Sequence, residues 1–230
     1  RCAPMVEREL FRYTILRLTD QHVWLVQLYH HLVIDGYSAA RLSRRIAALY
    51  RAVTTGNSAA PSGYRSLRDL VTEDREYRQS EQRAQDERYW VDAMTPLPPV
   101  GGREGGEKHS GGRTVHITQT LSPQDSDRLK SLGSRAGSNW VDVLLGAYAG
   151  YVHRLTGRRD VVMALPMMVR TTTAALKTPA MAVNVLPLRV QVSAEDTAAD
   201  LASKVFTAMV GVREHQRFRG EDLPGALGVP

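Results

Sequence analysis

The sequence has a single cysteine, Cys2, among its 230 residues. One cysteine cannot close a disulfide within the chain, so we expect a protein of the reducing cytoplasm. No apolar stretch approaches the roughly 20 residues that a membrane-spanning helix needs, so no membrane partner is expected. The first residues, Arg1-Cys2-Ala3-Pro4, also lack the apolar centre of a secretory signal. Hydrophobic residues make up 43% of the sequence, which is enough to form a substantial core.

Patterns typical of zinc sites and nucleic-acid surfaces are also missing. No Cys-x-x-Cys pair is present, which argues against thiolate metal sites. The net charge is +6 and the sequence pI is about 9.7, but basic and acidic residues alternate, as in residues 72–78. Such mixing is typical of a solvated helix face, so no nucleic-acid partner is expected.

Two adjacent histidines mark the most informative segment, Tyr29 to Gly36. Residues 22–29 are rich in β-branched and aromatic side chains, which predicts a strand. Because successive strand side chains point to opposite faces, His30 should continue a face of large apolar residues and be buried. His31 should continue the face that becomes polar and look into a cavity. The same divergence argues against a metal ion held by His30, His31 and Asp35.

Extended and helical segments alternate along the rest of the chain. The helix expected over 37–53 has one apolar face, which should pack on the sheet that carries the histidines: Leu42, Ile46, Leu49, Tyr50 and Val53. Residues 65–94 form a polar helical stretch. Strands are expected at 114–121, 160–165 and 183–192, and helices from Ser122-Pro123, over 140–155 and over 197–216. The helix over 140–155 is apolar almost all round and should lie in the core. This alternation predicts a layered α/β or α+β fold.

Proline and glycine are concentrated between Pro96 and Gly112, which is the clearest linker in the chain. It divides the sequence into residues 1–95, the linker at 96–112, and residues 113–230.

Several motifs occur in an order that resembles one known family. The segment from His30 to Gly36 fits the pattern HHxxxDG. Four further segments follow it: Arg88-Tyr89-Trp90, Pro166-Met167-Met168-Val169-Arg170, Asn184-Val185-Leu186-Pro187-Leu188-Arg189 and His215-Gln216. Together, roughly residues 10–228 resemble the condensation domains of nonribosomal peptide synthetases, relatives of chloramphenicol acetyltransferase.

The resemblance implies a two-layer sandwich fold, built as two chloramphenicol acetyltransferase-like lobes in a V. Residues 1–95 would be the C-terminal part of an incomplete first lobe, and residues 113–230 a second lobe truncated at its C-terminus. The family joins an amine to a thioester, with both substrates carried on the 4′-phosphopantetheine arms of carrier proteins. The expected partners are upstream and downstream peptidyl carrier proteins and an adjacent adenylation domain, with no cofactor bound by this domain itself. The positive charge would steer acidic carriers, or would serve solubility alone.

Residues 179–188 and 215–223 resemble condensation domains of enterobactin-type siderophore synthetases. This resemblance implies a siderophore as the class of product.

The resemblance also assigns roles to individual residues. His31 is the expected catalytic residue, as a general base or as a group that positions the amine, and the sequence leaves both open. Asp35 would pair with Arg170 across the lobe interface. A backbone amide beside Gly36 could approach the reacting carbonyl, because a residue without Cβ admits close contact. Three further residues are expected at the substrate channel or in structural roles. Tyr37 would line the channel or simply pack. Ser38 favours a helix cap or a turn hydroxyl. Asn184 would bind backbone at the substrate tunnel or fasten the lobes.

The sequence is also compatible with other functions. A coenzyme A-dependent acyltransferase would carry the same HxxxDG motif. The doubled histidine and the later motifs favour substrates bound to carrier proteins instead. An epimerization domain would need further acidic residues, and a heterocyclization domain has aspartates in place of His30 and His31. A platform that recruits carriers without catalysis is the nonenzymatic alternative.

Overall fold

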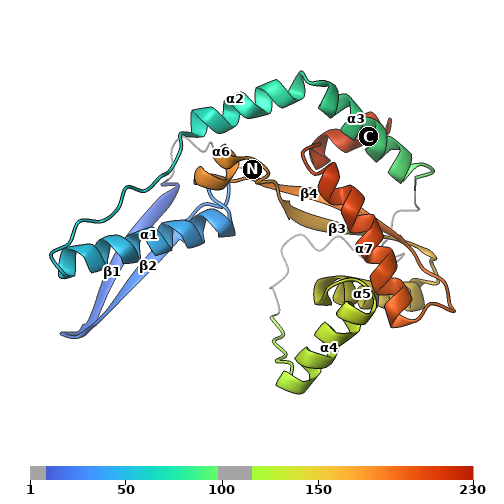
Figure 1. Ribbon diagram of the computed structural model, residues 1–230, viewed down its shortest axis with the longest axis horizontal. Helices are drawn as coiled ribbons and strands as arrows, with labels where there is room; N and C mark the ends of the chain where they lie inside the picture. Colours follow the sequence, from blue (N-terminus) through green and yellow to red (C-terminus); the bar gives the residue numbers. More distant parts are fainter. Residues whose placement is uncertain (1–8, 98–115, 230) are drawn as a thin grey trace. The chain divides into compact units, whose positions relative to one another are not determined.

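The computed structural model describes residues 9–97 and 116–229. The described chain forms two compact units (Figure 1). Of the described residues, the first unit comprises 9–80 and 168–183, and the second comprises 81–97, 116–167 and 184–229. Helices and strands are mixed along the described chain, as the sequence predicts, but they do not alternate regularly, because the first two strands are followed by five helices before the next strand. The division into lobes around residues 96–112 stays a prediction, because most of that segment lies outside the described residues.

The first unit contains a β-hairpin and three helices. Strands β1 (Phe11–Thr19) and β2 (His22–Tyr29) pair antiparallel, with Phe11 opposite Tyr29 and Thr14 opposite Val26. Helix α1 (Gly36–Thr54) lies along the hairpin (Figure 1), and the amide of Gln27 donates to Ser43 Oγ at 3.1 Å. The helices α2 (Leu67–Arg78) and α6 (Thr173–Lys177) complete the unit. The predicted strand at 22–29 and the predicted helix at 37–53 are confirmed.

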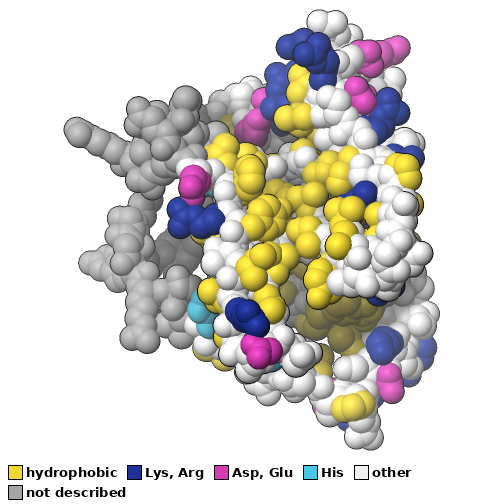
Figure 2. Space-filling model, turned by 90° about the vertical axis from the view of Figure 1, so that its left-hand side faces the viewer, with side chains coloured by type: hydrophobic (Ala, Val, Ile, Leu, Met, Phe, Trp, Pro, Cys, Tyr) yellow, Lys and Arg dark blue, Asp and Glu magenta, His cyan; other side chains and the backbone are white. Residues whose placement is uncertain are grey.

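Hydrophobic side chains remain exposed on both faces of the hairpin. Figure 2 shows hydrophobic side chains gathered on the side of the molecule where Figure 1 draws the hairpin. One face exposes Phe11 and Ile15, and the other exposes Trp24 and Leu28. Contiguous apolar surface of this kind usually marks a contact with another polypeptide segment.

The apolar stripe of α1 is only partly buried. Leu42 and Ile46 are partly buried, whereas Leu49, Tyr50 and Val53 are exposed. The prediction that the whole stripe packs on the sheet is therefore wrong for its C-terminal part, where no described element covers the helix.

The second unit holds the larger core. It contains α3 (Glu81–Met94), α4 (Pro123–Arg135), α5 (Trp140–Thr156), the paired strands β3 (Asp160–Met168) and β4 (Val183–Gln191), α7 (Ala198–Glu214), a 3-10 turn (Gly220–Asp222) and α8 (Leu223–Ala226). Side chains from α3, β3, β4, α5 and α7 meet in one buried cluster around Trp90, Leu188 and Val205. Helices α5 and α7 pack closely (Figure 1), since a Cβ on Gly146 would lie 3.0 Å from the backbone of Leu201.

Two expectations for this unit are wrong. Residues 116–121 are not a strand, because no described strand lies beside them to accept a ladder of hydrogen bonds, and residues 114–115 lie outside the described residues. Helix α5 is only half buried: Val143 and Ala149 face the core, while Trp140, Tyr148 and Tyr151 are exposed. An apolar helix surface shows what could be buried, but a neighbour must be present to bury it.

The helix starts follow local chemistry. Ser122 Oγ accepts from the amide of Asp125, and Pro123 occupies the first helical position of α4, as predicted. Thr197 and Asp200 form a capping box at the start of α7. The predicted polar stretch at 65–94 is two helices, α2 and α3, separated at Gln79 and Ser80.

The turn after α7 is closed by one side chain of β4. The amide nitrogen of Asn184 donates to Gln216 O at 3.0 Å and to Phe218 O at 2.6 Å, and Asn184 Oδ1 accepts from Gly220 N at 3.0 Å. The backbone at Gly220 comes so close to β4 that an added Cβ would lie 1.9 Å from the carbonyl oxygen of Val185. The turn therefore requires glycine at position 220.

We expect Gly220→Ala to lower the free energy of unfolding by about 1–3 kcal/mol or more, because the added methyl group forces the turn away from β4. The measurement is urea unfolding followed by circular dichroism. Gly225→Ala is the matched control, since a Cβ there meets no atom within 4 Å. Equal destabilisation by the two substitutions would contradict the proposed close approach.

Candidate active site

The histidine motif forms a turn between β2 and α1. The strand ends at Tyr29, and the amide of His30 still donates to Leu10 O at 2.8 Å. The amide of Val33 then donates to His30 O at 3.1 Å and closes the turn. Asp35 follows as the N-cap of α1, with its Oδ1 accepting from Ser38 N at 2.8 Å. Aspartate suits this position because its carboxylate satisfies an amide that the helix leaves unpaired.

Both histidines are exposed. The prediction that His30 is buried is wrong, because the strand ends one residue earlier and the apolar face of β2 has no described cover. His30 Nδ1 accepts a hydrogen bond from the amide of Leu32 at 3.2 Å. No hydrogen bond joins the His31 ring to any residue within 9–97 or 116–229. The His31 imidazole is therefore open to a molecule that approaches from solvent.

Behind the turn lies a buried ion pair. Asp35 and Arg170 are 2% and 5% exposed, and Arg170 Nη2 lies 2.7 Å from Asp35 Oδ2. This is the pair that the resemblance implied, but both residues belong to the first unit rather than to two different units.

The Arg170 guanidinium is bonded on nearly every side. Nη1 donates to Thr178 O at 2.9 Å and to Ala175 O, and Nη2 donates to Ser38 Oγ at 2.7 Å and to Ala180 O at 2.8 Å. A buried charge is costly unless it is paired and hydrogen-bonded, and Arg170 meets that condition. Residues 168–183 thus wrap around this side chain.

The environment of Asp35 favours its charged form. Burial raises the pKa of the Asp35 carboxyl, but hydrogen bonds from Ser38 N, Arg170 and Ala182 N outweigh it and hold the pKa below its usual value. Asp35 is therefore a fixed anion at neutral pH, which suits a structural role rather than proton transfer.

Ser38 and Tyr37 both contact the buried Arg170 side chain. Ser38 is fully buried, and its Oγ accepts from Arg170 and from Ala180 N while donating to Ala180 O at 3.0 Å. Of the two structural roles expected for Ser38, the helix cap is wrong, because Asp35 caps α1. A buried, fully bonded hydroxyl also cannot line a channel. The ring of Tyr37 lies 4.7 Å from Cζ of Arg170, and its hydroxyl donates to Leu176 O at 3.1 Å.

Gly36 and Asn184 belong to different units. A Cβ on Gly36 would meet no described atom within 4 Å, so the start of α1 is open to approach. Asn184 belongs to the second unit, where its amide group is engaged by the turn at 216–220. The structure thus groups His31, Asp35, Gly36, Tyr37, Ser38 and Arg170 in one unit and leaves Asn184 outside that group.

Two motifs far apart in sequence meet in the second unit. The rings of Tyr89 and His215 stack with centroids 4.0 Å apart, and Trp90 Nε1 donates to His215 O at 3.0 Å. His215 Nδ1 lies 2.8 Å from Oδ1 of Asp86, which is 1% exposed. Burial, followed by the nearby charge of Glu214, raises the pKa of Tyr89. Sequence reasoning missed Asp86, although an acid on the buried face of α3 was a usable signal.

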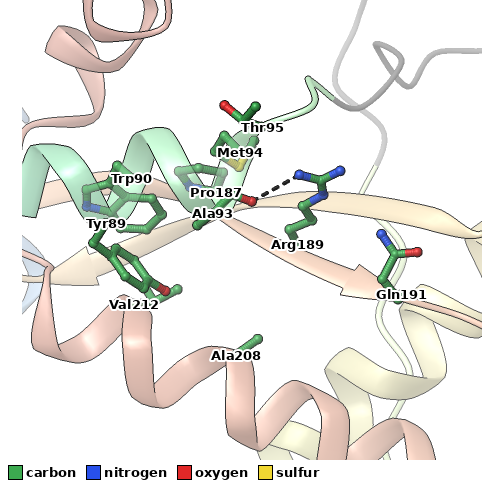
Figure 3. Close-up of a pocket in the computed structure, with 10 residues that line it drawn as sticks. All are labelled: Tyr89, Trp90, Ala93, Met94, Thr95, Pro187, Arg189, Gln191, Ala208 and Val212. Carbon is green, nitrogen blue, oxygen red and sulfur yellow. Dashed lines mark hydrogen bonds between the residues drawn. The ribbon is translucent and has the colours of Figure 1, made fainter.

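A cavity of about 380 Å³ lies between α3, β4 and α7 (Figure 3). Its walls include the aromatic rings of Tyr89 and Trp90 and the guanidinium of Arg189. Arg189 is already committed, since it forms an ion pair with Asp160 at 2.6 Å and donates to Ala93 O at 3.0 Å. The cavity has the size of a small-molecule site, but its cation is neutralised.

Within the described residues, no three His, Cys, Asp or Glu side chains are grouped as metal ligands. None of the described helices has the length and hydropathy needed to cross a bilayer.

Known proteins are similar to this chain in sequence and in fold. Residues 5–230 match the condensation domain family. A dimodular nonribosomal peptide synthase of Bacillus subtilis strain 168 is 33% identical over 221 residues, which are 96% of this chain and 9% of that protein. Enterobactin synthase component F of Escherichia coli O157:H7 is 27% identical over 217 residues, 94% of this chain and 17% of that protein.

Among solved structures, the first condensation domain of the calcium-dependent antibiotic synthetase, in complex with a substrate analogue, has a TM-score of 0.81 and 33% identity. The match covers 95% of this chain and 49% of that one. The chain therefore spans about half the length of that structure and a small part of its curated relatives.

We expect Asp35→Ala to destabilise the protein by about 3–5 kcal/mol, because it leaves the Arg170 guanidinium buried without its anion. The yield of folded protein should fall, and urea unfolding should show the loss. Asp20→Ala is the control, since Asp20 forms an exposed ion pair with Arg17 and should change little. An unchanged melting temperature for Asp35→Ala would rule out the structural role.

The lowered pKa of Asp35 also predicts that the stability of the folded protein depends on pH in the acidic range. A carboxyl with a depressed folded-state pKa contributes stability above its ordinary pKa, and this contribution is lost as the pH falls through the folded-state value. Below about pH 4, wild-type stability should therefore fall more steeply than that of Asp35→Asn. Urea unfolding midpoints measured between pH 7 and pH 3 give the pH dependence of stability for both proteins. Parallel curves would show that Asp35 does not contribute to the pH dependence.

Proposed function

This chain belongs to the condensation domain family, and on that premise we propose that it contributes to amide-bond formation between carrier-bound substrates. The amine of one carrier-bound aminoacyl group attacks the thioester carbonyl of a second carrier-bound acyl or peptidyl group. A C–N bond forms, the C–S bond breaks, and the proton from the amine ends on the released pantetheine thiol.

One observation carries the proposal. The turn that begins at His30 is fixed from behind by the buried Asp35–Arg170 pair, and it leaves His31 exposed with no described hydrogen-bond partner. An imidazole can accept or hold a proton near neutral pH if the amine lies within hydrogen-bond reach. We propose that His31 is the catalytic residue, as the base for the amine or as the group that positions it.

The start of α1 offers a second contribution. Gly36 is exposed and has open space beside its Cα. A backbone amide at an open helix start can approach a carbonyl oxygen and stabilise the negative charge that develops there. We therefore place the thioester carbonyl near Gly36 and the attacking amine near His31.

The partners follow from the chemistry. Both substrates arrive on 4′-phosphopantetheine arms, so we propose upstream and downstream peptidyl carrier proteins and an adjacent adenylation domain as partners. The similarity to enterobactin synthase component F supports a siderophore as a candidate product class. Thioester-linked intermediates and a single cysteine fit a reducing cytoplasm.

The test uses the intact synthetase with two loaded carrier proteins and mass spectrometry of the condensed thioester. We expect His31→Ala to lower the rate of product formation by about 10²-fold or more, the range of a lost acid–base group. The melting temperature should stay unchanged, because the His31 side chain is exposed.

His22→Ala is the matched control, because His22 is an exposed histidine at the start of β2, the strand that precedes the turn. It should retain wild-type activity. Carrier binding without any condensed product in the wild-type synthetase would favour a recruiting platform over an enzyme.

A further inference from the structure

Two buried side-chain nitrogens have no hydrogen-bond partner within the described parts of the chain, and both are Nε atoms of arginine: Arg41 and Arg170. Buried donors without a hydrogen bond are uncommon, because an unsatisfied buried donor costs free energy. The two arginines share one neighbour. The Cζ atoms of Arg170 and Arg41 lie 4.7 Å and 5.7 Å from the centre of the Tyr37 ring.

The Arg170 guanidinium lies over the face of the Tyr37 ring. Its Nη1 and Nη2 atoms are bonded to Asp35, Ser38 and backbone carbonyls, so Nε is the donor that remains. The face of an aromatic ring carries negative potential and attracts a guanidinium within about 6 Å. A desolvated contact of this kind is stronger than an exposed one.

The Tyr37 ring is itself held in place. Its hydroxyl donates to Leu176 O at 3.1 Å and accepts from Arg41 Nη1 at 3.2 Å. Arg41 in turn lies 5.7 Å from the centre of the Tyr64 ring, and the Tyr64 hydroxyl donates to Arg41 O at 3.1 Å. Cations and rings therefore alternate in the order Arg170, Tyr37, Arg41, Tyr64.

We propose that Tyr37 is a positioning residue, whose ring is the electrostatic partner of Arg170 and thereby holds the Asp35–Arg170 pair behind the His31 turn. The effect on catalysis rests on the proposed function, whereas the effect on Arg170 does not. The ring, not merely the volume of the side chain, is what the site requires. Tyr37→Phe keeps the ring and loses the hydroxyl, and Tyr37→Leu keeps an apolar side chain and loses the ring.

The first experiment is nuclear magnetic resonance of the isotope-labelled chain. We expect the Arg170 Hε signal to be shifted upfield by the ring in the wild type and in Tyr37→Phe. In Tyr37→Leu the signal should return to the usual arginine position, and the folding equilibrium constant should fall about tenfold, within the range of a desolvated cation–π contact. Tyr50→Leu is the control, because Tyr50 is an exposed tyrosine on the same helix.

The second experiment measures condensation in the intact synthetase. We expect Tyr37→Leu to lower kcat about tenfold with the KM for the carriers unchanged, and Tyr37→Phe to restore most of kcat. A wild-type synthetase that forms no product would refute the proposed function, while the upfield Arg170 signal would still support the contact with Tyr37. Identical Arg170 signals and stabilities in Tyr37→Phe and Tyr37→Leu would overturn the positioning role.

Discussion

The Asp35–Arg170 ion pair is the constraint on which the first unit depends. Two charges are removed from water there, and their mutual attraction alone does not offset the loss of hydration. The remaining cost is met by the segment 168–183, whose backbone oxygens accept from Arg170 and whose Ala182 amide donates to Asp35. The pair therefore joins parts of the chain that are 135 residues apart. The end of β2, the start of α1 and the turn between them acquire their geometry from a contact that neither local propensity nor hydrophobic burial supplies.

This constraint separates the two kinds of polar residue in the motif. The carboxylate is buried, bonded on both oxygens and fixed as an anion, so it has no proton to exchange near neutral pH. The imidazole of His31 is exposed and has no described partner. A group that is fully bonded holds geometry, and a group with free lone pairs can act on a substrate. The motif thus contains both a rigid support, Asp35, and a reactive side chain, His31. The support explains why a turn, rather than a strand, can hold the reactive side chain.

Local chemistry in the sequence predicted much of the fold, and failed where neighbours decide the outcome. Side-chain composition predicted β2, and a serine followed by a proline predicted the start of α4. The resemblance, not the residues alone, predicted the partner of Asp35. Periodicity could not show that His30 and the exposed face of α5 would lack a covering layer, nor that residues 116–121 would lack a partner strand. The roles of Ser38 and Asp86 escaped prediction because each is defined by a side chain that is more than 100 residues away.

The motif side chains of the second unit bond to the backbone of the segment after α7. Trp90 donates to the carbonyl of His215, the ring of Tyr89 stacks on that histidine, and Asn184 bonds to three backbone groups of the following turn. Such side chains fix the path of the chain where helices and strands end. Their presence is therefore evidence for the shared fold, and it adds little evidence for chemistry. Of the residues that the family resemblance picks out, His31 alone combines a reactive group with an exposed position and no described partner, so the assignment of an activity depends on that one side chain far more than on the number of motifs that match.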